Sequence, residues 1–85
     1  MSRVLSIRYC DNAAPQAAAF LRAWEQRGLQ AQQVAGSGYA LHSRPGEELL
    51  LACSGAELQI TGPAQDDTYS FIKAFAASSG GELLH

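Results

Sequence analysis

The sequence predicts an α+β fold, a two-layer sandwich in which an antiparallel or mixed sheet of four to five strands carries two helices on one face. The chain has 85 residues, which is enough for one domain with a single core. Two segments place apolar residues at helical spacing, and the segments between them alternate with the period of a strand. The first strand has one polar face, which indicates a sheet whose other side is open to solvent.

The first strand is predicted at residues 4–9, where apolar and polar side chains alternate. Leu5 and Ile7 fall on one face, whereas Ser6 and Arg8 fall on the other. Because Ser6 and Arg8 then point away from the core, this strand favours an antiparallel sheet with one wetted face over a sheet covered on both sides.

The first helix is predicted at residues 14–27. Asp11 and Asn12 offer side-chain acceptors for the free N–H groups at its start, and Pro15 is tolerated in the first turn. Gly28 is placed to end the helix in a left-handed conformation. The apolar residues at helical spacing are Ala17, Phe20, Leu21 and Trp24.

Short β segments separated by turn residues fill the middle of the chain. Residues 29–34 are polar and predict an edge strand. The following segments predict an antiparallel meander, and the apolar run 49–52 is typical of a central strand. The meander segments are 39–43, 48–53 and 57–61. The intervening turns are expected at residues 36–38, at 44–47, where the Pro-Gly pair favours a type II turn, and at 54–55.

A second helix is predicted after the Gly62-Pro63 break. Asp66 and Asp67 place negative charge at its start, and residues 78–81 end it. The apolar and small residues at helical spacing are Thr68, Phe71, Ile72 and Phe75. The sequence leaves open whether residues 82–85 add a short final strand.

The resulting element order is β-α-β-β-β-(β)-α-(β). If two of the short strands merge across residues 36–38, the order is that of a ferredoxin-like sandwich. If the last strand is absent, it is closer to a small thioredoxin-like variant. The two alternatives remain open from the sequence.

Cys10 is the one reactive side chain at a junction between a strand and a helix. A thiol in this position can be activated by N–H groups of the helix start. The pair Tyr9-Cys10 resembles the start of small thioredoxin-like redox proteins, and this resemblance covers about the first 25 residues. In that family a second cysteine or a selenocysteine follows, and the matching position here is Ala13. A thiol-dependent redox function of Cys10 is therefore an alternative to a residue that only packs at the corner.

Other chemical sites are not indicated. The soft metal ligands are far apart in sequence, so we expect no metal site and no cofactor. These ligands are Cys10, Cys53, His42 and His85. The adjacent carboxylates Glu47-Glu48 and Asp66-Asp67 are better explained by helix capping and solubility than by acid–base catalysis.

Charge and composition disfavour several classes of partner. The net charge is −2, and the six basic residues are dispersed rather than clustered. A nucleic-acid partner and a polybasic membrane contact are therefore not expected. We find no apolar stretch of the length of a signal or membrane segment, and this predicts a cytoplasmic protein.

The most informative surface is the polar face of the predicted sheet. Ser6, Arg8 and His42 are the candidate contact residues, and the small side chains Ala40 and Ala52 would make part of this face flat. We therefore expect a non-catalytic binding or interaction module that acts through this open face, either on a protein partner or as a homodimer.

Overall fold

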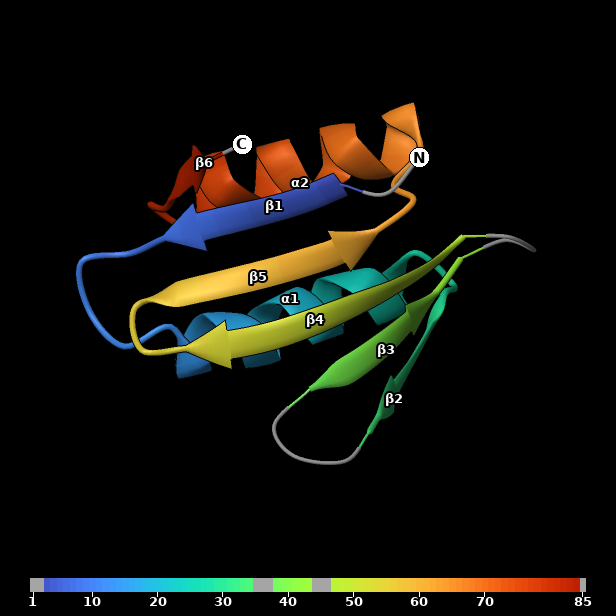
Figure 1. Cartoon of the computed structure of the whole chain (residues 1–85), viewed down its shortest axis with the longest axis horizontal. Helices are drawn as coiled ribbons and strands as arrows, with labels where there is room; N and C mark the ends of the chain where they lie inside the picture. Colours follow the sequence, from blue (N-terminus) through green and yellow to red (C-terminus); the bar gives the residue numbers. More distant parts are fainter. Residues whose placement is uncertain (1–2, 35–37, 44–46, 85) are drawn as a thin grey trace.

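A computed structural model of the chain describes residues 3–34, 38–43 and 47–84. These residues form a six-stranded antiparallel sheet with two helices behind it, as Figure 1 shows. The predicted α+β class with two helices is confirmed. The predicted strand number of four to five is wrong, because the sheet has six.

The strands and helices follow the chain in the predicted order. They are β1 (Arg3–Arg8), α1 (Ala14–Gln26), β2 (Gln30–Gln33), β3 (Tyr39–His42), β4 (Glu48–Ser54), β5 (Glu57–Gly62), α2 (Asp66–Ser78) and β6 (Glu82–Leu84). The sheet order is β2-β3-β4-β5-β1-β6, and every neighbouring pair is antiparallel. The predicted meander is therefore β3-β4-β5, and β2 is an edge strand as predicted.

Two pairings account for the additional strands. β2 and β3 do not merge but pair as a hairpin, with Gln33 opposite Tyr39. The C-terminal segment pairs with β1, with Leu83 opposite Ile7, so the last strand is present. The turns expected at residues 36–38 and 44–47 lie mostly outside the described residues.

The core lies between the helices and one face of the sheet. Alternate residues of the strands point into it, such as Leu5 and Ile7 of β1 and Leu49 and Leu51 of β4, all almost fully buried. Leu50 between them is 47% exposed, so the apolar run of β4 lies in a central strand with only one buried face.

Aromatic side chains join the two helices. Phe20 and Trp24 of α1 contact Phe71 of α2 edge-on, with ring centroids 5.5 and 5.7 Å away. The guanidinium of Arg27 lies 4.5 Å from the centre of the Phe71 ring and covers this cluster. The aromatic residues of the two helical stripes therefore pack on each other.

Candidate functional site

The face of the sheet turned away from the helices is the candidate site, and we call it the open face. Paired residues of an antiparallel sheet point to the same side, so the register defines its members. Ser6 lies opposite Gln59, and Arg8 lies opposite Glu57. His42 lies on the same side, because its strand continues the register through β4. All three predicted contact residues are therefore on the open face.

Three large apolar side chains of the described residues are exposed, and all three belong to this face. Val4 is 59% exposed, Leu50 47% and Val34 39%. Val4 and Leu50 both lie opposite Thr61. Val34 continues the β2 register, with its N–H donating to the Gly38 carbonyl, and its side chain lies on the same side of Gly38 as that of Leu50.

Two neighbouring rows across the middle of the open face carry no charge. One row runs through Leu50 and Thr61, and the other runs through Ser6 and Gln59. We call these rows the uncharged band. Its members are Val4, Ser6, Gln32, Ala40, Leu50, Ala52, Gln59, Thr61 and Leu84.

Charged rows border the band at both ends of the strands. At one end Arg8 contacts Glu57, with 3.2 Å between Nη2 and Oε1, and lies opposite Glu82. At the other end His42 Nδ1 is 4.0 Å from Glu48 Oε2. Both pairs are partly exposed, so each contributes little to stability. The open face therefore has an uncharged centre and a charged border.

Cys10 is exposed in the segment between β1 and α1. Its exposure differs from the expectation of a residue that only packs at the corner between strand and helix. Two N–H groups at the helix start already have acceptors, since Ala13 donates to the Gly55 carbonyl at 2.8 Å and Ala14 donates to Asn12 Oδ1 at 3.0 Å. Asn12 thus provides the predicted cap. Ala13, the position of the missing second thiol, is fully buried.

Tyr9, beside Cys10, connects β1 to the end of α2. Its phenol oxygen is 2.7 Å from Ser79 Oγ. Burial raises the pKa of the Tyr9 phenol above its usual value, and the hydrogen bond to Ser79 partly offsets this rise. Tyr9 is therefore a neutral structural side chain at neutral pH and offers no charge to Cys10.

The adjacent carboxylates do not meet across a cleft. Glu48 is exposed on the open face, whereas Glu47 is 1% exposed at the start of α2. Glu47 Oε2 accepts from the Gln65 N–H at 2.6 Å, and Oε1 accepts from the Thr68 hydroxyl at 2.9 Å. Glu47 therefore caps α2, a helix-capping role like the one that the sequence indicated.

A groove separates α1 from the strands that it only partly covers. Its volume is about 370 Å³, and Cys53 is half-buried there beside Leu21 and Tyr39. Among the described residues, no three His, Cys, Asp or Glu side chains come together as a metal site would require. His85 is outside the described residues.

Sequence reasoning missed the exposed apolar residues of the open face. Val4 has the same parity as Ser6 and Arg8, which was an available signal. Leu50 carried no such signal, because a run of leucines does not reveal which one faces the core. Val34 follows the end of β2, where parity depends on the hairpin register.

Comparisons of the chain with family models, curated proteins and solved structures gave no match. No helix among the described residues has both the length and the apolar character needed to cross a membrane.

Proposed function

We propose that this chain is a non-catalytic interaction domain that forms a homodimer by packing the open faces of two copies together. The observation that carries the proposal is the gathering of Val4, Val34 and Leu50 on one face. Single exposed apolar side chains are common, but an uncharged area with several of them and a polar border is typical of a contact surface. Here Val4 and Leu50 flank Thr61 within such an area.

The arrangement of charge supports this proposal. The interior of a protein interface is depleted of charged residues, and its rim is polar. The uncharged band and its bordering rows, with Arg8 and Glu57 at one end and His42 and Glu48 at the other, follow this pattern. Two sheets that pack face to face form a core of interdigitated side chains about 10 Å thick.

A second copy is favoured as the occupant by the mixed charge of the border. A twofold interface uses the same surface on both subunits, so a face of one sign would repel its copy. Here both signs are present in the border, as Arg8 lies between Glu57 and Glu82. A domain of this size also gains stability by covering an apolar face.

We further propose that the fold is a ferredoxin-like sandwich with an added hairpin. Four strands in the order β4-β5-β1-β6, with α1 and α2 in the connections, match the β-α-β-β-α-β arrangement. The hairpin β2-β3 is then an insertion between α1 and β4 that extends the sheet at one edge. The present β6 and the wholly antiparallel sheet argue against the thioredoxin-like variant.

The thiol-dependent alternative has weaker support. Cys10 is exposed, but two N–H groups at the helix start are engaged and Ala13 is buried. Ala13 occupies the position where thioredoxin-like redox proteins have their second thiol. The open face is therefore the better candidate.

Sedimentation velocity between about 1 and 200 μM tests the homodimer. We expect the unmodified chain to sediment as a dimer in the micromolar range. Leu50→Asp should weaken dimerisation at least tenfold, which is about 1.4 kcal/mol, because it places a charge in the uncharged band. Ala74→Asp, on an exposed position of α2, is the matched control and should leave the dimer unchanged.

The proposal is wrong if the unmodified chain remains monomeric at the highest concentration. It is also wrong if Leu50→Asp dimerises as well as the control while both retain the same circular dichroism spectrum. Either result would leave the open face as a solvated surface.

A further inference from the structure

β2 is a free edge of the sheet, at the opposite side from β6, and Figure 1 shows it at the outer end of the order. The backbone on its outer side is available for another strand. In an antiparallel pair, residues alternate between those bonded to the partner strand and those that point away. The Val34 N–H donates to the Gly38 carbonyl at 3.1 Å, which sets this alternation for β2.

Counting back from Val34 places Ala31 and Gln33 among the residues whose N–H and C=O groups point outward. Gln32 and Gln30 pair inward, with Ala40 and His42. No hydrogen bond of the described residues uses the outward groups of Ala31 or Gln33. β2 therefore presents two donors and two acceptors in line, enough to pair with a strand of three to four residues.

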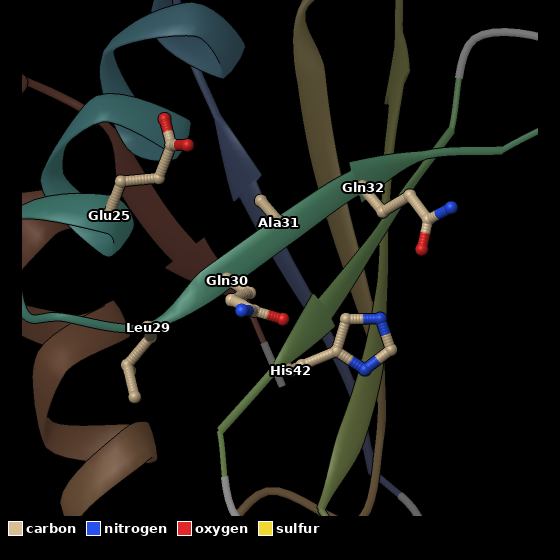
Figure 2. A pocket seen from close by; sticks show the side chains of 6 residues that line it. All are labelled: Glu25, Leu29, Gln30, Ala31, Gln32 and His42. Carbon is tan, nitrogen blue, oxygen red and sulfur yellow. The ribbon is translucent and has the colours of Figure 1, made fainter.

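A hollow of about 480 Å³ adjoins this edge. Figure 2 shows that Glu25 and Leu29 lie on one side of β2 and that Gln30, Gln32 and His42 lie on the other. The hollow thus borders the strand on both sides, as a site for an added strand requires.

β2 is short, with four residues, but it lacks the charges and the proline that commonly protect an edge. Proteins block free edges with lysine or other charges, proline, bulges or very short strands. The sequence of β2 is Gln-Ala-Gln-Gln, with no charge and no proline. The other edge, β6, has three residues and begins with Glu82. The two edges therefore differ in how readily they accept a partner.

We propose that β2 binds an extended segment of a partner protein as an added strand, and that this segment carries a basic residue. Among the residues that line the hollow, the carboxylate is that of Glu25, and there is no lysine or arginine. Arg27 is engaged over the rings of Trp24 and Phe71. A lysine or arginine of the added strand would therefore meet an opposite charge.

The side-chain chemistry of the segment follows from the two sides of β2. On the helix side, Leu29 and Ala31 favour a small apolar residue. On the open-face side, Gln30, Gln32 and His42 favour an uncharged polar residue such as threonine. A second copy of β2 is less suited, because it would bring the same glutamine-rich strand and the same carboxylate. The hollow shares Gln32 and His42 with the open face, but backbone pairing along the outer edge of β2 does not require a second copy of the chain.

The test uses a capped synthetic peptide with the sequence Lys-Thr-Val-Thr-Val-Thr-Val-Lys and follows the backbone amides by ¹⁵N NMR. We expect the resonances of Ala31 and Gln33 to shift and their hydrogen exchange to slow at least tenfold. A peptide with N-methyl groups on its four central amides should not bind, because it loses donors for the ladder. Glutamate in place of both lysines should weaken binding about threefold or more, and Glu25→Gln should remove that difference.

Variants of the protein separate edge pairing from other contacts. Gln33→Pro removes one outward N–H and leaves the ladder with β3, as proline is tolerated on a free edge. It should weaken binding at least tenfold, whereas Gln33→Val should retain it. Binding in Leu50→Asp should equal that of the unmodified chain, so failure of the homodimer does not affect this result.

Three results would overturn the proposal. The first is equal binding of the N-methylated and unmodified peptides. The second is a set of shifts away from β2. The third is slow exchange of Ala31 and Gln33 in the free protein, which would mean that another segment or a second copy already covers the edge.

Discussion

At the scale of single residues, Glu47 connects two segments that are distant in sequence. Its carboxylate, 1% exposed, accepts hydrogen bonds from the Gln65 N–H and the Thr68 hydroxyl. Gln65 and Thr68 lie in the first turn of α2, where free N–H groups and the helix dipole favour a negative charge. The residue at the N-cap position, Gln65, makes no capping bond with its own side chain. Glu47 supplies the cap instead.

The first prediction concerns this cap. Glu47→Gln should lower the free energy of unfolding by about 2 kcal/mol. The substitution replaces a charged acceptor by a neutral one, and the new side-chain NH₂ group would face the Gln65 N–H or the Thr68 hydroxyl, which now donate to Glu47. Chemical denaturation measures the change. Glu48→Gln is the matched control, and its effect should stay within about 0.5 kcal/mol, since Glu48 is exposed. Equal effects of the two substitutions would contradict the capping role.

At the scale of elements, Gly62 lets the end of β5 approach the start of β4. Its φ is +146°, a conformation that other residues rarely adopt. A Cβ at this position would lie 2.8 Å from the Glu48 carbonyl oxygen and 2.7 Å from Leu49 Cδ2. The backbone oxygen belongs to the sheet and cannot move aside without disturbing the β4–β5 pairing.

Gly62→Ala should therefore reduce the free energy of unfolding by about 3 kcal/mol, through backbone strain and overpacking together. Gly55→Ala is an informative comparison, because Gly55 has a φ of +59° but no atom within 4 Å of a Cβ. Its cost should be about 1 kcal/mol, from the left-handed conformation alone. A thermal denaturation series gives both values. If Gly55→Ala were the more damaging change, the close approach at Gly62 would not matter.

The elements themselves were largely predictable. α1, α2 and the meander strands were identified from local spacing, because a helix or a strand with one buried face repeats its apolar residues at a fixed period. The hydrogen bond from the Ala14 N–H to Asn12 at the start of α1 and the positive φ of Gly28 also followed from local chemistry. The number of strands was not predictable in this way, since β2 and β6 are short and their existence depends on the strands beside them.

At the scale of the whole molecule, the main feature is the open face, which a second copy would cover in the proposed homodimer. Figure 1 shows both helices on one side of the sheet, and the register places the uncharged band on the other side. If two copies cover this band, folding and association are coupled, and stability depends on protein concentration.

We therefore expect the melting temperature of the unmodified chain to rise by about 3 °C or more for each tenfold increase in concentration between about 5 and 500 μM. The melting temperature of Leu50→Asp should rise less with concentration than that of the unmodified chain, because its dimer is weaker. Differential scanning calorimetry at three concentrations is sufficient. A constant melting temperature of the unmodified chain would contradict the coupling.

The candidate site was predictable only in part. Ser6, Arg8 and His42 were placed on the open face from their strand patterns, whereas Val4, Val34 and Leu50 were not. The difference lies in register. A strand with clear alternation reveals its own faces, but the leucine run of β4 shows them only through its neighbours.

The sequence by itself determined the α+β class, the position of both helices and a sheet with one wetted face, because these depend on periods of two to four residues. Only the tertiary structure decided that β1 lies between β5 and β6, that Glu47 caps α2, that Leu50 faces solvent and that β2 has a free outer edge. Each of these depends on which distant segments come together. Local spacing carries no information about which distant segments pair. The packing of the shared core determines that pairing.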